Sequence, residues 1–268
     1  MQNIPLPNKV EIKPSKEKNQ SKVSIQPCHP GYGTTLGNAL RRVLLSSLPG
    51  GAITAFKIKG VSHEFATIDN VLEDVVEISL NLKQVRFKVH NEEPVRLKLK
   101  ASGEKKVTAK DIQATSDVEV INTDQVIATL TSKSAELEMD IIVEQGRGYL
   151  PTEAREKENT EADIILLDAV FTPVKNVGFY IENVRVGQMT NYENLILEIE
   201  TDGSITPEQA LSAANKILID HFQFIDGSVQ GEAEPKVKAK KDKTEEAAED
   251  VETKEEKKSK KAEKKEDK

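Results

Sequence analysis

The stretch GYGTTLGNALRRVLLSSLPG, residues 31–50, begins like a phosphate-binding loop and continues into a leucine-rich helix. Its glycines follow the order G-x-G-x-x-x-G, whereas a dinucleotide-binding fingerprint reads G-x-G-x-x-G. A P-loop ends in Gly-Lys-Ser/Thr, but here Gly37 is followed by Asn38. Neither nucleotide-binding pattern is met, so the stretch favours another role.

The first two glycines, Gly31 and Gly33, are interpreted as a sharp turn from the strand KVSIQ into the helix, because glycine accepts backbone angles that other residues avoid. We expect Thr34 or Thr35 to cap the first amides of this helix. The helix itself is predicted over residues 35–48.

This helix is apolar on more than one side. One stripe has the spacing of a single helical face and consists of Leu36, Ala39, Leu40, Val43 and Leu44. A second surface combines arginines with leucines and consists of Asn38, Arg41, Arg42, Leu45 and Leu48. A helix of this kind is normally buried against more than one neighbour, and an arginine on a partly apolar surface often anchors a protein partner.

A second helix with two apolar stripes is predicted over residues 207–225. Thr206 at the N-cap, Pro207 at the first position and Gln209 at the third form a capping-box arrangement that defines its start. The stripes are Leu211, Ala214, Leu218, Phe222 and Ile225 on one side, and Ala210, Ala213, Ile217 and Phe224 on the other. Although each of these residues could belong to an ordinary core, the two helices together predict a symmetric dimer.

The middle of the chain reads mainly as strands. Alternating apolar and polar residues predict half-buried antiparallel strands at 85–90, 95–100, 137–143 and 195–200. A further helix is predicted over residues 70–83, because apolar residues spaced three and four apart define one buried face; they are Val71, Leu72, Val75, Ile78 and Leu82. The fold class is therefore α+β.

Composition indicates a soluble, cytoplasmic protein. The single cysteine excludes an internal disulfide, the longest apolar runs are shorter than a membrane span, and the polar N-terminus has no signal-peptide core. Residues 231–268 hold 13 Lys and 13 acidic residues, so residues 1–230 carry the whole net charge of −7. Little direct contact with DNA is expected from such an acidic region. The tail, residues 231–268, has almost no large apolar side chains and is predicted to be disordered.

No arrangement of residues predicts an active site. The four histidines lie far apart in the sequence, and no cluster has the spacing of metal ligands. Glu73, Asp74 and Glu77 are interpreted as the solvated face of a helix, and Cys28 lacks a motif that would mark a nucleophile. We therefore expect neither a catalytic residue, nor a metal site, nor a cofactor in this chain.

Four segments in order resemble the N-terminal domain of the bacterial-type RNA polymerase alpha subunit. They are GYGTTLGNALRRVLLSSLPG (31–50), HEFATIDNVLEDVVEISLNLK (63–83), GRGYLP (146–151) and the block from LLDAVFTPV to PEQAL (166–211). The resemblance covers about residues 5–230. It implies a discontinuous dimerisation domain of residues 1–49 and 174–230, with a mainly β domain of residues 50–173 inserted into it.

The resemblance also implies a function and its residues. The chain would be a homodimer that scaffolds the beta and beta-prime subunits of DNA-directed RNA polymerase, a nucleotidyltransferase, without being catalytic itself; omega and sigma would join in the holoenzyme. The implied beta contacts are Arg41, Arg42, Leu45 and Leu48, and the implied beta-prime contacts are Lys83 and Leu167. The dimerisation residues would be Tyr32, Leu36, Leu40, Val43, Leu211, Leu218 and Phe222.

Members of this family usually continue into a helical C-terminal domain that binds promoter DNA. In its place stands the Lys/Glu tail, so we expect that contact with promoter DNA to be absent. Two alternatives remain at this point. An independent adaptor dimer would use the same helices without the polymerase subunits, and a nucleotide-using enzyme would bind nucleotide saturably on the glycine loop.

Overall fold

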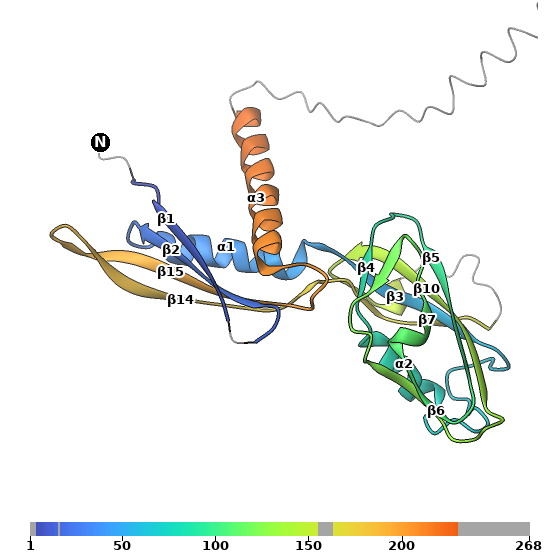
Figure 1. The fold of residues 1–268 in the computed structure, drawn as a ribbon. Helices are drawn as coiled ribbons and strands as arrows, with labels where there is room; N and C mark the ends of the chain where they lie inside the picture. The colour runs from blue at the N-terminus through green and yellow to red at the C-terminus, as the bar shows by residue number, and fades with distance from the viewer. Residues whose placement is uncertain (1–3, 16, 155–162, 230–268) are drawn as a thin grey trace, which may run out of the picture. The chain divides into compact units, whose positions relative to one another are not determined.

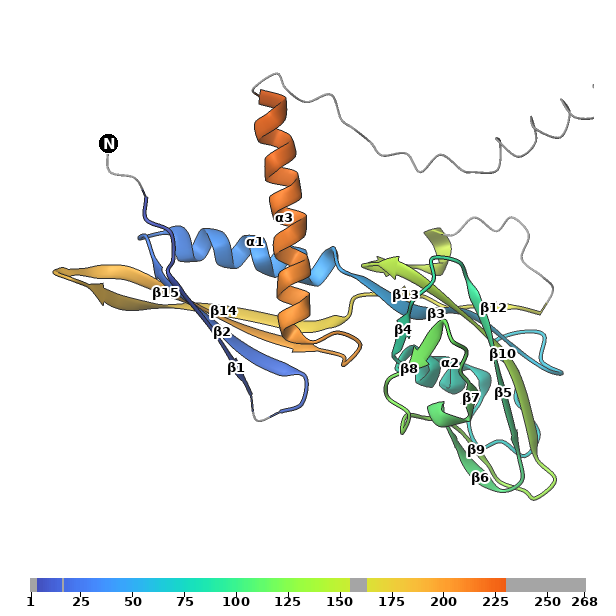
Figure 2. The same cartoon turned by 45° about the horizontal axis from the view of Figure 1, so that its top comes forward.

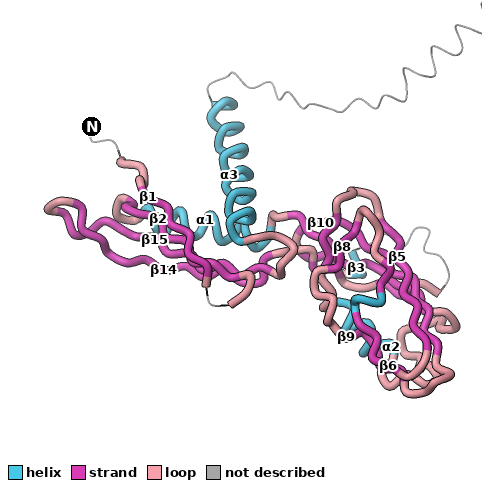
Figure 3. The backbone as a smooth tube through the Cα atoms, in the orientation of Figure 1, coloured by secondary structure: helices cyan, strands magenta, loops and turns pink. Residues whose placement is uncertain are grey.

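The structure is a computed structural model that describes residues 4–15, 17–154 and 163–229 of the 268. It confirms the α+β class, with three α-helices among these residues and mainly antiparallel strands (Figure 1; Figure 3). The chain divides into two compact units, Met1–Asp220 and His221–Lys268. The tail predicted to be disordered, 231–268, lies outside the described residues.

A four-stranded antiparallel sheet is formed by segments from both ends of the sequence. Its strands, in spatial order, are β1 (Lys9–Pro14), β2 (Gln20–Cys28), β15 (Met189–Thr201) and β14 (Val174–Val186). Helix α1 (Tyr32–Ser46) lies along β14 and β15, and helix α3 (Pro207–Val229) follows β15 in the chain (Figure 2). The core between sheet and helices includes Val23, Leu40, Leu44, Leu48, Val177, Leu195, Leu197, Ala210, Leu211 and Ala214.

Helix α1 approaches the sheet closely because small residues face it. A Cβ atom at Gly37 would lie 2.7 Å from the ring of Phe179 and 3.0 Å from Leu195. Gly33 is buried one turn earlier, and Leu40 and Leu44 continue the same face. The glycines of the opening stretch therefore provide room for helix–sheet packing as well as for a turn.

A second core belongs to the segment between β3 and β13. A seven-stranded sheet contains β7 (Ile112–Gln113), β5 (Val95–Ser102), β10 (Glu136–Arg147), β3 (Pro49–Ile58), β4 (Phe87–Val89) and β8 (Val118–Val120), with β12 (Ile165–Leu166) paired to β3. Two small pairs are β11 (Tyr149–Leu150) with β13 (Ala169–Val170) and β6 (Lys105–Thr108) with β9 (Val126–Leu130). Helix α2 (Val75–Lys83) contributes Val75, Ile78 and Leu82 to this core.

The predicted strands are present, and three of the four are longer than expected. The helix predicted over 35–48 spans Tyr32–Ser46, and the helix predicted over 207–225 extends to Val229. The largest error lies at the start of the remaining helix. The helix predicted over 70–83 begins only at Val75, because Asp74 has an extended backbone and acts as the N-cap. Its carboxylate accepts a hydrogen bond from the amide of Glu77. Leu72, which the periodicity placed on the buried face, is 71% exposed. The capping box at the start of α3 is confirmed by reciprocal 3.3 Å hydrogen bonds between Thr206 and Gln209.

Among the described residues, no helix is both long enough and apolar enough to cross a membrane.

Candidate protein-interaction surfaces

The glycine loop is occupied by a side chain from the neighbouring sheet. The carboxylate of Glu193, on β15, accepts the amides of Gly31 and Gly33 through its two oxygens, each at 2.8 Å. The prediction that Thr34 or Thr35 caps the helix was wrong. Gly31 is the N-cap and has no side chain to form a capping hydrogen bond, and the Thr35 hydroxyl instead donates a hydrogen bond to the carbonyl of Gly31. A phosphate would need these same two amides.

The two arginines of α1 lie on a different side of the helix from most of the nearby leucines. Arg41 and Arg42 are exposed and Leu45 is half-buried, so these three residues share an accessible side of the helix. Leu48, grouped with them from the sequence, is only 1% exposed and belongs to the core. The side chain of Leu48 therefore has almost no free surface for a beta contact in this structure.

The residues predicted to dimerise differ in their accessibility. Tyr32 and Phe222 are exposed, whereas Leu36, Val43 and Leu218 are half-buried against the core. Leu40 and Leu211 are buried in the chain's own core, so in this structure they support the helices from within.

The last turns of α3 expose large apolar side chains. More than half of the surface of each is accessible in Phe222, Phe224, Ile225 and Val229. Four such side chains within eight residues are more than a lone solvated helix normally presents.

Lys83 lies in a small polar network. Its ammonium group contacts the Asp168 carboxylate at 3.0 Å, and the other oxygen of Asp168 accepts the amide of Thr152 at 3.0 Å. The bond from Thr152, followed by that from Lys83, lowers the pKa of Asp168 below its ordinary value. Leu167, the other predicted beta-prime contact, is 4% exposed, so its exposed or half-buried neighbours provide the surface there.

The acidic trio near α2 has structural roles that the sequence did not reveal. Asp74 caps the helix, and both oxygens of Glu73 bind Thr129, one to its amide at 2.6 Å and one to its hydroxyl at 2.8 Å. The interpretation of Glu73 and Asp74 as a merely solvated face was therefore wrong.

Two further features considered from the sequence are the single cysteine and the possible metal ligands. Cys28 is buried, its thiol donates to the carbonyl of Ile25, and burial raises its pKa. Within the described part of the chain, no three His, Cys, Asp or Glu side chains gather in a way that could hold a metal ion.

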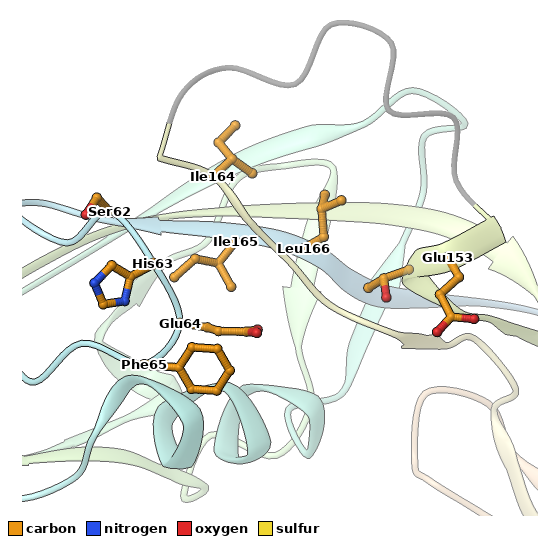
Figure 4. Close-up of a pocket in the computed structure, with 9 residues that line it drawn as sticks. Ser62, His63, Glu64, Phe65, Glu153, Ile164, Ile165 and Leu166 are labelled. Atoms are coloured by element: carbon orange, nitrogen blue, oxygen red, sulfur yellow. The ribbon is translucent and has the colours of Figure 1, made fainter.

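An open groove of about 440 Å³ lies beside the Lys83 network. Its walls are the loop that carries Glu64 and Phe65 and the turn that carries Thr152 and Glu153; the segment 164–166 lies between them (Figure 4). Sequence reasoning predicted neither a helix nor a strand over residues 63–65, HEF, and did not single them out as a surface.

Comparison with known proteins identifies the family. The model of the RNA polymerase Rpb3/RpoA insert domain matches residues 56–172. The DNA-directed RNA polymerase subunit alpha of Oceanobacillus iheyensis is 48% identical over 218 residues, which are 81% of this chain and 68% of the relative. The same subunit of Moorella thermoacetica is 49% identical over 203 residues, covering 76% and 64%. That of Chloroherpeton thalassium is 45% identical over 250 residues, covering 91% and 76%.

The chain thus spans roughly two thirds to three quarters of the length of these curated relatives. An identity near one half over three quarters or more of the chain is far above the level at which only a fold is shared. The chain belongs to the family of DNA-directed RNA polymerase alpha subunits.

Proposed function

We propose that this chain forms a homodimer that holds the beta and beta-prime subunits of RNA polymerase together, without performing catalysis itself. The observation that carries the proposal is that α1 and α3 each expose side chains of a different kind. Exposed arginines occupy one side of α1, and exposed apolar side chains occupy the last turns of α3. We place its action in the cytoplasm, with omega and sigma as further partners.

Dimerisation is supported by the apolar end of α3. Each of three side chains would contribute about 1.5–3 kcal/mol to the free energy of dimerisation if it were buried in a two-fold interface; they are Phe222, Phe224 and Ile225. An isologous interface uses the same patch on both copies, so a single exposed patch is sufficient.

The beta contact is supported by the accessible side of α1. Arg41 and Arg42 are exposed, and neither guanidinium group contacts a described carboxylate. Leu45 adds a half-buried apolar surface one turn from Arg41. An arginine beside an apolar surface is a frequent hot spot of a protein interface.

The beta-prime contact is supported by Lys83 and its surroundings. The ion pair with Asp168 holds the ammonium group at one place beside the 166–168 segment. A partner would therefore meet a cation and a carboxylate in a defined arrangement, next to the half-buried Leu166.

Assembly is tested by co-expressing a tagged chain with its own beta and beta-prime subunits. Wild type should recover both large subunits. Arg42→Ala should remain dimeric and recover much less beta, whereas Lys133→Ala, which removes an exposed cation outside the proposed contacts, should behave as wild type. Recovery of neither large subunit by a dimeric wild-type chain would replace the polymerase proposal with the independent adaptor.

Dimerisation is tested separately by sedimentation of the purified chain. Phe222→Ser combined with Ile225→Ser should shift the mass from two copies to one, because polar side chains remove the apolar patch. Leu72→Ser, which alters an exposed leucine elsewhere, is the control and should stay dimeric. A wild-type chain that sediments as a monomer at all concentrations would contradict this part of the proposal.

A further inference from the structure

The groove between the HEF loop and the Thr152 turn has a mixed chemical character (Figure 4). Phe65 is 78% exposed at one wall, although a phenyl ring is normally buried. Ile164 and Leu166 are half-buried between the walls, with Ile165 buried beneath them. The groove therefore offers an apolar surface that no described residue covers.

The charge of the groove has one sign. Among the described residues that line it, the ionised side chains are Glu64 and Glu153, on opposite walls. Both are exposed, and neither pairs with a described cation. Two carboxylates on either side of an apolar floor favour a ligand that carries positive charge at its ends and an apolar side chain between them.

The groove is continuous with the Lys83 network. Thr152 lines the groove, and its amide binds the carboxylate of Asp168, which in turn holds Lys83. Leu166 lines the groove two residues before Asp168 in the same extended segment. Any partner that reaches Lys83 along this segment also reaches the groove.

We propose that this groove docks a segment of the beta-prime subunit in which Lys or Arg residues flank an apolar side chain. The inference rests on the proposed function and extends it, because it assigns a second contact with stated chemistry next to Lys83. The apolar side chain packs on Phe65 and the 164–166 segment, and the flanking cations pair with Glu64 and Glu153.

The two parts of this contact differ in their response to salt. Each exposed charge pair contributes modestly, so removing both carboxylates should weaken beta-prime binding by roughly two- to thirtyfold. Truncation of an aromatic hot spot typically costs more, about thirtyfold or above. Salt screens the first contribution and leaves the second largely unchanged.

The test is a titration of the full tagged chain with beta and beta-prime at about 0.1 M and about 0.5 M salt. Glu64→Gln combined with Glu153→Gln should recover beta normally and beta-prime poorly at the lower salt, and should lose most of the salt dependence. Phe65→Ala should weaken beta-prime recovery at both salt concentrations. The unfolding midpoints should match wild type because all three side chains are exposed.

Matched controls come from outside the groove. Glu119→Gln removes an exposed carboxylate from β8, and Leu72→Ala shortens an exposed apolar side chain of the loop that follows Phe65. Both should bind beta-prime as wild type does.

The outcomes separate this inference from the proposed function. If wild type recovers both large subunits and the groove variants recover beta-prime equally well, the groove is not a docking site and the assembly role stands. Loss of beta instead of beta-prime would overturn the assigned partner. If wild type recovers neither subunit, the proposed function itself fails.

Discussion

Glu193 binds the amide of Gly33 at 2.8 Å through the oxygen that a Cβ atom at position 33 would approach to 2.7 Å. The Glu193 carboxylate can therefore occupy this position only because Gly33 has no side chain. Because Gly33 opens α1 and Glu193 lies on β15, the contact joins the helix to the sheet. It also places a negative charge at the helix N-terminus, where it is favourable.

Removal of the Glu193 carboxylate should destabilise the chain. Glu193→Ala leaves two amides without their acceptor and should lower the free energy of unfolding by about 1–3 kcal/mol. Glu193→Gln keeps one carbonyl oxygen and should lose about half as much. Denaturant-induced unfolding measures both values. A loss below a few tenths of a kcal/mol for Glu193→Ala would mean that water replaces the carboxylate without cost.

Gly33→Ala should have opposite effects in two backgrounds. In wild type the new methyl group displaces the carboxylate, and the lost hydrogen bonds outweigh the helix propensity of alanine. In Glu193→Ala the methyl group meets only the ordinary 3.4 Å contact with Ile181, so the same substitution should stabilise by up to about 1 kcal/mol. The four unfolding free energies form a double-mutant cycle, and additive values would contradict the coupling.

Gly37→Ala tests the close packing of α1 on the sheet. The added Cβ would lie 2.7 Å from the ring of Phe179, so we expect a loss of about 1–3 kcal/mol despite the better helix propensity. Gly178→Ala is the control, because a Cβ there has no heavy-atom neighbour within 4 Å. Equal unfolding midpoints for the two variants would show that the helix moves away without cost.

The stability difference between wild type and Asp168→Asn should depend on pH. The pKa of Asp168 is lowered in the folded chain, first by the Thr152 amide and then by Lys83. Its charge therefore stabilises the fold above the ordinary aspartate pKa of about 3.9, and this contribution is lost as pH falls through the lowered value. Asp168→Asn should be less stable by up to about 1 kcal/mol near neutrality, with the difference vanishing at the acid end. A constant difference at every pH would exclude the ion pair as its cause.

Truncation of Leu48 and of Arg42 to alanine should change the free energy of unfolding by different amounts, although the sequence analysis placed both residues on one surface. Leu48→Ala removes a side chain that is 1% exposed and should cost about 2–5 kcal/mol of unfolding free energy. Arg42→Ala removes an exposed side chain and should leave stability within about 0.5 kcal/mol. Thermal unfolding of the two variants compares them, and equal losses would contradict the placement of Leu48 in the core.

Local signals predicted many elements well. The alternation in VRLKLK and LEMDIIV reappears as β5 and β10, in which every second residue from Leu97 and from Leu137 is buried along the predicted stretch. The reciprocal bonds of Thr206 and Gln209 begin α3 where the capping box predicted. Such signals work because period-two burial and helix capping depend on residues that are neighbours in sequence.

Several errors arose where the deciding partner is distant in sequence. The cap of α1 comes from Glu193, 162 residues after Gly31, so threonines near the loop seemed the better candidates. Glu73 binds Thr129, and Asp168 joins Lys83 to Thr152, through contacts that no local pattern encodes. The predicted domain limits at 49/50 and 173/174 remain predictions.

The sequence by itself determined the α+β class, the apolar faces of the helices and the family, since these depend on residue type and spacing along the chain. Only the tertiary structure decided that Leu40 and Leu44 of α1 are core while both of its arginines are exposed, because a helix offers several faces and the sheet it packs on selects one of them. Tertiary structure also brought Glu64 and Glu153 to opposite walls of one groove, because the segment between these walls is held in place by pairing of β12 with β3.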